Sequence, residues 1–461
     1  MEISTKELQQ DLLGKLIQPN DEEYEQVRQV YNAMIDKHPR LIARCEDVAD
    51  VVAAVNYARE NNMLVAIRGG GHNAAGLGSC DDGLVIDLSQ MNGVHVDPNR
   101  RTARVEAGCT WHKVDHATHA FGLVVPSGII SSTGVAGLTL GGGIGHLSRR
   151  FGLTIDNLLE ADMVLADGSF VKVNDEENSD LFWAIRGGGG NFGVITSFLF
   201  KLHSLETDFA GPMLWEMGQA KPVMQWYRDF ILTAPKEVNG FFTFLQIPPV
   251  EPFPAEHHNK IMAGMVWCYT GAMEKAEGVF EEIREQLPPP AIDMVGPIPH
   301  PALQSMFDVF YPPGLQWYWK ADFVEEISDE AIDLHIAHAK ELPTMASSMH
   351  LYPINGAVHD VAEDATAWSY RDANWAEVIV GVDPDPANKQ LITDWARDYY
   401  NDLHPYCLEG AYINFMMEEG EDRIRATYRG NYERLVEIKS KYDPDNLFRV
   451  NQNIRPAAKE Q

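Results

Sequence analysis

The sequence predicts an α+β protein of two lobes, and three observations support this. The chain has 461 residues, well above the size of a typical single domain. Residues 40–205 alternate short helical and strand patterns and are dense in glycine, whereas residues 206–410 hold less glycine and more Trp, Tyr, Phe and Pro. We therefore expect a first domain at 1–206, a second at 207–410 and a C-terminal segment at 411–461 that returns to the first.

The first lobe begins with a helix followed by strands. Valines recur at helical spacing over residues 48–55, directly after Asp47, a residue type that caps helix N-termini. The short apolar runs MLVAI at 63–67 and LVIDL at 84–88 have the length and composition of strands, and so does TARVEA at 102–107. Helices and strands thus alternate along this part of the chain.

Further along, VLADGSFVKV at 164–173 predicts two strands joined by an Asp-Gly turn. DLFWAIR at 180–186 predicts a short helix that begins at its aspartate. In the second lobe, residues 273–286 and 328–341 have helical periodicity between apparent strands. Near the C-terminus, one helical face before a DPDN turn is predicted to carry Tyr432, Leu435, Val436 and Lys439.

Charge and hydropathy exclude several classes of partner. The formal net charge is −30, from 37 Lys and Arg against 67 Asp and Glu, and the sequence contains no basic cluster. Such a charge opposes binding to nucleic acid and to anionic lipid. The N-terminal segment has no apolar core of signal-peptide length, and no apolar run of about 18 residues occurs. We expect a cytoplasmic monomer or homodimer without a membrane anchor.

The cysteines do not form a metal or disulfide pattern. They are odd in number, widely spaced and free of CxxC or Cys/His ligand spacing. The sequence therefore predicts reduced thiols and no metal site. The five are Cys45, Cys80, Cys109, Cys268 and Cys407.

Three glycine clusters lie between the regular elements of the first lobe: RGGGHN at 68–73, GGGIG at 141–145 and RGGGGNFG at 186–193. Glycine lets backbone amides approach a ligand closely and adopts positive φ. None of the clusters is a Walker loop, and GGGIG lacks the flanking elements of a dinucleotide-binding fingerprint. One such cluster alone is more often a turn or bulge. Three in one lobe favour a site for a pyrophosphate or an isoalloxazine edge.

His72 follows a strand and a glycine loop directly, so its imidazole faces whatever the loop binds. A neutral imidazole is a competent nucleophile. The alternative is a histidine that only hydrogen-bonds a phosphate or the backbone, and composition alone favours that alternative.

Four long segments of the chain resemble the berberine bridge enzyme family, within the vanillyl-alcohol oxidase group of FAD enzymes. They are RGGGHN, VPSGIISSTGVAGLTLGGGIGHLSRRFGLTIDNLLEADMVLADG, LFWAIRGGGGNFGVIT and YERLVEIKSKYDPDNLFRVNQNI. The resemblance runs from about residue 38 to the end of the chain. It implies the two-lobe FAD-binding fold of the vanillyl-alcohol oxidase type, with an inserted substrate domain whose antiparallel sheet covers the isoalloxazine. The active site would lie at the junction of the lobes.

The same resemblance implies how FAD is held. A ring nitrogen of His72 would bond the flavin 8α-methyl carbon. Many members also bond flavin C6 to a cysteine, but Ile130 occupies the matching position here, so a single covalent link is expected. The residues expected around the pyrophosphate are Arg68, Gly69, Gly70, Gly71 and Asn73, and those expected along the adenine and ribose are Gly134, Gly137, Gly142, Gly145 and Val194. Asn451 and Asn453 would contact the isoalloxazine or ribityl region, or would only cap the C-terminus.

Hydride transfer to flavin N5 also needs a base for the substrate O–H or N–H proton. The resemblance places Tyr412, of AYINF, beside the flavin, with Asn414 on the same strand face. A tyrosine is a poor base unless a cation or the flavin lowers its pKa, and a pocket-wall tyrosine is the alternative. A looser match makes Asp360 a second candidate. It would act as the base, lower the pKa of Tyr412 through a bridging residue, or be a solvated strand residue.

The resemblance implies an FAD-dependent oxidase of a CH–OH or CH–NH group in a sugar, alkaloid-like compound or other secondary metabolite, with reoxidation by O2. A dehydrogenase that uses another acceptor and a non-catalytic flavin-binding or structural protein are the alternatives. Aromatic side chains of the second lobe would wall the substrate pocket or pack in the core. They are Phe310, Tyr311, Trp317, Tyr318 and Trp319.

Overall fold

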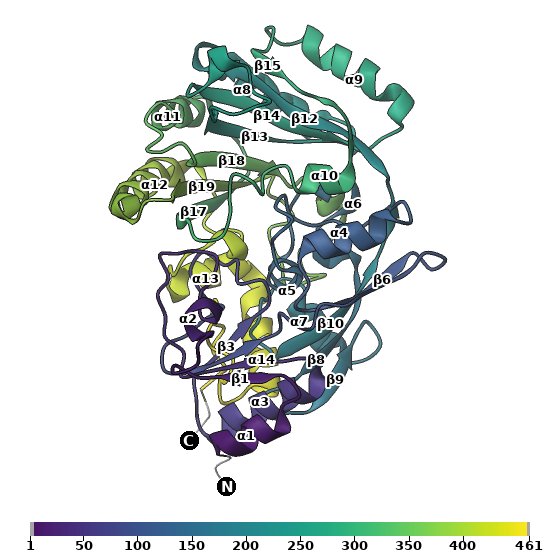
Figure 1. Cartoon of the computed structure of the whole chain (residues 1–461). Helices are drawn as coiled ribbons and strands as arrows, with labels where there is room; N and C mark the ends of the chain where they lie inside the picture. The colour runs from purple at the N-terminus through teal and green to yellow at the C-terminus, as the bar shows by residue number, and fades with distance from the viewer. Residues whose placement is uncertain (1–3, 459–461) are drawn as a thin grey trace.

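Two lobes lie one above the other in the computed structural model, which describes residues 4–458 (Figure 1). The N-terminal elements and the C-terminal helices α13 (Glu421–Tyr428) and α14 (Tyr432–Tyr442) share the lower lobe, and the middle of the chain forms the upper one. Helices and antiparallel sheets occur in both, which confirms the α+β class. The domain boundaries near residues 206 and 411 stay a prediction.

A four-stranded sheet forms the base of the lower lobe. Its strands in spatial order are β1 (Lys15–Ile17), β2 (Leu41–Arg44), β4 (Leu84–Asp87) and β3 (Val65–Arg68). Strands β2, β4 and β3 are parallel. Helix α3 (Val48–Glu60) connects β2 to β3 and begins where the Asp47 carboxylate accepts a hydrogen bond from the Asp50 amide, as predicted. This connection delivers the first glycine loop at the end of β3.

The second sheet of the lower lobe is antiparallel. Its order is β5 (Val94–Asp97), β6 (Thr102–Glu106), β10 (Val194–Lys201), β8 (Leu158–Val164) and β9 (Phe170–Val173). The predicted hairpin is confirmed, because β8 and β9 pair across a turn in which Gly168 has φ +83°. Helix α7 (Ser179–Ile185) is also confirmed. It begins after Asn178, however, and the Asp180 carboxylate instead contacts Lys441 and Tyr442.

Shorter helices complete the lower lobe and the junction. They are α1 (Thr5–Asp11), α2 (Tyr24–Val27), α4 (Trp111–His119), α5 (Val135–Gly141), α6 (Ser148–Phe151) and α10 (His300–Gln304). Strands β7 (Leu123–Val124) and β11 (His203–Ser204) form a small pair between them.

One antiparallel sheet organises the upper lobe. Its strands in order are β15 (Ile292–Asp293), β12 (Thr207–Glu216), β14 (Ile261–Tyr269), β13 (Val238–Gln246), β18 (Ser348–Pro353), β19 (Trp375–Asp383) and β17 (Gln316–Val324), with β16 (Gly296–Pro299) paired to β12. Helices pack on its outer face: α8 (Ala220–Thr233), α9 (Met273–Glu285), α11 (Asp329–Ala339) and α12 (Lys389–Leu403). The two predicted helices, α9 and α11, are thereby confirmed. The inner face of β13, β18, β19 and β17 is turned toward the lower lobe (Figure 1).

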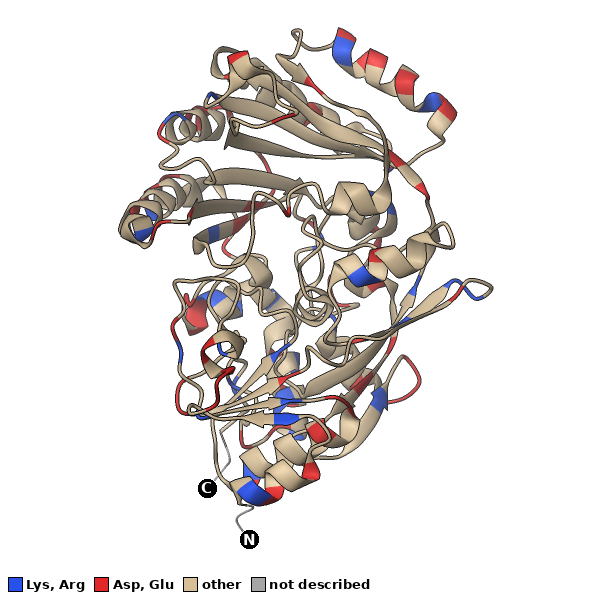
Figure 2. Ribbon diagram, viewed as in Figure 1, with Lys and Arg blue, Asp and Glu red and all other residues tan. Residues whose placement is uncertain are grey.

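Charged residues gather on peripheral helices such as α9, whereas the sheet strands of the upper lobe carry few (Figure 2). Within residues 4–458, no helix is both long enough and apolar enough to cross a bilayer. In the same range, His, Cys, Asp and Glu side chains nowhere form a group of three or more that could hold a metal ion.

Candidate active site

A deep cavity lies where the two lobes meet, and segments far apart in sequence line it. The lower lobe contributes residues 67–73, one side of α5, and the residues Gly189, Gly190, Asn191, Gly193 and Ile195. The C-terminal part of the chain contributes residues 412–415 and 450–452. The inner faces of β17, β18 and β19 close the opposite side. Such a junction is a common place for a small-molecule site.

Glycine residues, which expose their backbone, form much of the lower wall of the cavity. Gly69, Gly70 and Gly71 follow β3, and Gly70 lies against Gly134, which precedes α5. A Cβ on Gly70 would lie 2.5 Å from the Gly134 amide nitrogen, so both positions require glycine. At Gly137 a Cβ would meet no protein atom within 4 Å, although this glycine lines the cavity. The wall is therefore open to close approach by a ligand.

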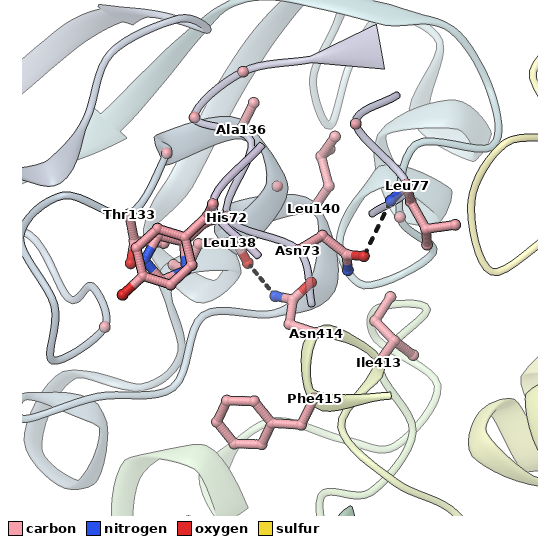
Figure 3. Close-up of a pocket in the computed structure, with 18 of the residues that line it drawn as sticks. His72, Asn73, Leu77, Thr133, Ala136, Leu138, Leu140, Ile413, Asn414 and Phe415 are labelled. Carbon is pink, nitrogen blue, oxygen red and sulfur yellow. Dashed lines mark hydrogen bonds between the residues drawn. The ribbon is translucent and has the colours of Figure 1, made fainter. Parts of the chain in front are cut away.

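His72 extends from the first glycine loop into this cavity, beside α5 (Figure 3). Its ring stacks on Tyr31, with 3.7 Å between ring centroids. The Tyr31 hydroxyl in turn donates a hydrogen bond to the Tyr311 carbonyl. Burial lowers the pKa of His72 to about 4, so the imidazole is neutral at pH 7. Its buried Nε2 atom has no hydrogen-bond partner among residues 4–458.

Other polar atoms in the lower half of the cavity also lack protein partners. The buried Arg68 guanidinium pairs with Asp87 through Nη2, at 2.9 Å, and its Nη1 is left over among the described groups. Asn451 donates to the Gly190 carbonyl, and its buried Oδ1 likewise accepts from no described residue. Asn73 accepts from the Leu77 amide (Figure 3). A glycine cradle with spare donors and acceptors fits the pyrophosphate and ring edges of FAD.

Four residues expected at the cofactor do not reach the cavity: Gly142, Gly145, Val194 and Asn453. Gly142 packs under Trp368 and Tyr412, and Gly145 packs on the backbone of Ser127. Val194 is fully buried in β10, and its neighbours Gly193 and Ile195 line the cavity instead. The GGGIG cluster therefore serves close packing.

Tyr412 lines the cavity with its hydroxyl fixed by two donors. The oxygen accepts hydrogen bonds from the Gly143 amide, at 2.9 Å, and from Asn414 Nδ2, at 2.7 Å. Asn414 also donates to the Leu138 carbonyl (Figure 3). Residues 413–415 form a 3-10 turn, not the expected strand, yet the two side chains still meet. The oxygen thus accepts two hydrogen bonds, and none of the hydrogen bonds among the described residues has this hydroxyl as its donor.

No cation activates this tyrosine among the described residues: burial raises the pKa of Tyr412 to about 12, against the opposing effect of its two donors. Asp360 does not help either. It ends a 3-10 turn at the surface, where its carboxylate pairs with Lys236 at 2.5 Å, and it is absent from the cavity wall. The interpretations of Asp360 as the base, or as a residue that lowers the pKa of Tyr412, are wrong, because the segment turns outward before β19. It is a solvated residue.

The aromatic wall is partly as expected. Tyr311, Trp317 and Trp319 line the cavity, whereas Phe310 and Tyr318 do not. Alternation along β17 explains this, since Tyr318 faces the opposite side and accepts a hydrogen bond from Arg397.

Sequence reasoning missed the part of the wall that β18 and β19 provide. Ser348, His350 and Tyr352 alternate along β18 toward the cavity, and Val378 and Val380 do so on β19. His350 Nδ1 lies 2.7 Å from the Tyr352 hydroxyl. The alternation of SMHLYP was the available signal for this face.

Known proteins resemble this chain in both sequence and fold. Residues 39–174 match a family model described as an FAD binding domain, and residues 411–455 match one described as berberine and berberine like. An FAD-linked oxidoreductase of Dictyostelium discoideum is 34% identical over 447 residues, 96% of this chain and 95% of that protein.

Two solved structures superpose over almost the whole chain. 6-Hydroxy-D-nicotine oxidase from Arthrobacter nicotinovorans has a TM-score of 0.87 at 23% identity and covers 99% of this chain and 100% of that one. Xylooligosaccharide oxidase from Myceliophthora thermophila, in complex with xylobiose, has a TM-score of 0.85 at 22% identity and covers 98% and 99%. These likenesses confirm the two-lobe fold of the vanillyl-alcohol oxidase type.

Proposed function

Because this chain belongs to the berberine bridge enzyme-like family of FAD-linked oxidoreductases, we propose that it oxidises a CH–OH or CH–NH group of a small molecule. When bound, FAD supplies the acceptor for the two electrons and the hydrogen that leave the substrate carbon, and O2 then reoxidises it. The observation that carries the proposal is the cavity itself. A glycine cradle with spare polar atoms forms one wall, and a neutral aromatic surface faces it.

We further propose that FAD is attached covalently through His72 alone. A neutral imidazole has a lone pair for bonding to the flavin methyl carbon, and the stacked Tyr31 ring fixes its orientation. Ile130 stands in the cavity wall, and no cysteine of the described residues does, so a thiol for a second bond is missing.

Tyr412 would hold the substrate oxygen or nitrogen. Its two donors fix the hydroxyl oxygen, so the hydroxyl would donate its own proton to the substrate near neutral pH. The Tyr31 and Trp317 rings, 5.2 Å apart, extend the aromatic wall from the flavin side toward the upper sheet and exclude water there.

The function is tested by anaerobic mixing of the purified flavoprotein with 6-hydroxy-D-nicotine, the compound named for one structural relative, and xylobiose, bound in the other. We expect the oxidised flavin absorption to bleach with one of these compounds or with a close analogue. Peroxide formation on admitting air supports an oxidase, and bleaching without rapid reoxidation supports a dehydrogenase. A flavin that dithionite reduces but no alcohol or amine of either class reduces would leave a non-catalytic flavin-binding protein.

Gly137 offers a test of the cofactor cradle that is separate from folding. Since nothing lies within 4 Å of its Cβ position, Gly137→Leu is expected to fold normally but to purify with roughly tenfold less flavin, because the new side chain fills the cavity. Flavin content per protein from the absorption spectrum and the thermal unfolding midpoint are the measurements. Gly278→Leu on the exposed face of α9 is the matched control, since its Cβ position is equally empty but far from the cavity. Equal flavin content in the two variants would contradict the cradle.

A further inference from the structure

A polar pair lies in the otherwise apolar inner face of the upper sheet. On β18, Met349 and Leu351 pack outward into the core beneath the helices, whereas His350 and Tyr352 face the cavity. The pairing register sets Thr243 of β13 and Val378 of β19 on either side of His350. His350 is therefore the polar centre of this face.

Among residues 4–458, no charged side chain forms a hydrogen bond or ion pair with this imidazole. Of the described residues in the cavity wall, Arg68 alone carries a formal charge, and it pairs with Asp87 in the lower lobe. Among the described residues, the titratable group in contact with His350 is Tyr352 on its own strand, and Tyr311, from the loop before β17, lines the same cavity. Phe241, Thr243 and Val378 provide its other neighbours. Burial lowers the pKa of His350 to about 3, which keeps the ring neutral.

The two ring nitrogens have different surroundings. Nδ1 lies 2.7 Å from the Tyr352 hydroxyl, and Nε2 has no protein partner within residues 4–458. When Nδ1–H donates to Tyr352, Nε2 presents a lone pair. Tyr412 is the complementary group, since its lone pairs are occupied and it offers a proton. The Phe415 ring contacts both tyrosines, with its centroid 5.8 Å from that of Tyr352 and 4.8 Å from that of Tyr412.

We propose that His350 is the proton acceptor for an uncharged alcohol substrate and that Tyr352 is a positioning residue that keeps its Nε2 unprotonated. This rests on the proposed function. In the step, the substrate C–H bond breaks and its electron pair and hydrogen pass to FAD. The O–H bond breaks as well, its proton goes to His350 Nε2, and the carbon–oxygen double bond forms. A neutral imidazole suffices because the hydroxyl becomes strongly acidic as its carbon loses electron density.

The neutral wall also decides the substrate class. A carboxylate or ammonium group on the substrate would be desolvated at this face without a counter-charge, which is strongly unfavourable. An uncharged hydroxyl avoids this desolvation cost, because it can donate a hydrogen bond to His350. The amine substrates that the family relation leaves open are therefore disfavoured at this site when they are protonated.

A set of ligands matched in size tests the charge preference without turnover. Benzyl alcohol, benzoate and benzylammonium are titrated into the oxidised flavoprotein, and binding is followed by the change in the flavin spectrum. We expect benzyl alcohol to bind at least about tenfold more tightly than either ion, with constant affinity from pH 5 to 9. Equal or tighter binding of an ion, no binding of benzyl alcohol, or an affinity that titrates near pH 6.5 would overturn the proposal. Protein without flavin would instead contradict the proposed function.

The chain supplies a matched pair for the variants. His335 Nδ1 lies 2.8 Å from the Tyr399 hydroxyl, both are buried, and burial also lowers the pKa of His335 to about 3. This pair packs behind the sheet, away from the cavity wall. His350→Asn keeps a donor near Tyr352 but removes Nε2, so it should weaken benzyl alcohol binding at least about tenfold. His335→Asn should change it less than about twofold, and equal effects would refute the role of His350.

Tyr352 is tested by the tautomer of its partner. In protein labelled with ¹⁵N-histidine, long-range proton–nitrogen correlations are expected to show His350 protonated at Nδ1, with the signal assigned from its loss in His350→Asn. Tyr352→Phe should shift His350 toward the Nε2-protonated form, and Tyr399→Phe should leave it unchanged. A wild-type His350 protonated at Nε2 would reverse the direction of the hydrogen bond and overturn the proposal.

Discussion

Replacing His72 with alanine is expected to release the flavin from the protein. Acid precipitation of the wild type should leave yellow flavin in the pellet, because a covalent bond survives unfolding, whereas the His72→Ala pellet should be colourless. The measurement is the flavin absorption of pellet and supernatant. The spare Nε2 atom, the neutral ring and the stacking on Tyr31 all favour this nitrogen nucleophile.

His146→Ala is the matched control for this experiment. His146 belongs to the same lobe, is 3% exposed, and has an Nε2 atom without a described partner. Burial lowers the pKa of His146 to about 3, yet its side chain does not line the cavity. The His146→Ala variant should therefore retain its flavin in the pellet. A colourless wild-type pellet would refute the tether and leave FAD as a dissociable cofactor.

Local patterns predicted the lower lobe well for a physical reason. The strand before RGGGHN, the capped helix α3 and the β8–β9 hairpin are each specified within about ten residues of chain. His72 directly follows such a strand and glycine loop, so its position depends on local backbone. The family motifs and the structure place it in the same cavity.

Residues whose position depends on distant pairing could not be found in this way. His350 faces the cavity because β18 pairs with β13 and β19, and Tyr31 belongs to a segment before the recognised motifs. Asp360 was misplaced because a 3-10 turn carries it outward, which a strand-like match cannot reveal. Glycines of GGGIG resemble a ligand loop in sequence, but they give room for Tyr412 and Trp368.

Lys439 holds the C-terminal segment on the lower lobe through a fully buried ion pair. Its ammonium lies 2.7 Å from Asp443, and both side chains are 0% exposed. The same group donates to the Asn191 carbonyl, within the third glycine cluster at 186–193, and to the Phe448 carbonyl, just before Asn451. One side chain thus joins α14, a glycine loop and the terminal wall of the cavity.

Lys439→Met is expected to destabilise the protein by about 3–5 kcal/mol, because it leaves the Asp443 carboxylate buried without its cation and two carbonyls without a donor. Shifts of the urea unfolding midpoint, read by circular dichroism, give this value. Lys441→Met is the control on the same helix. Lys441 pairs with Asp180 at the same 2.7 Å but at 59% and 34% exposure, so its loss should cost less than about 1 kcal/mol.

Comparing the stability lost by the two variants distinguishes the effect of burial from the effect of removing a charge. If the two variants lost equal stability, burial would not be the source of the effect, and the C-terminal segment would be held by its apolar contacts alone. If Lys439→Met loses the larger amount and also loses flavin, the buried ammonium links folding to the cofactor. Asn451 would then move with the Phe448 carbonyl that Lys439 and Asn451 both contact, and its bond to Gly190 would break. The cavity would open from its C-terminal side.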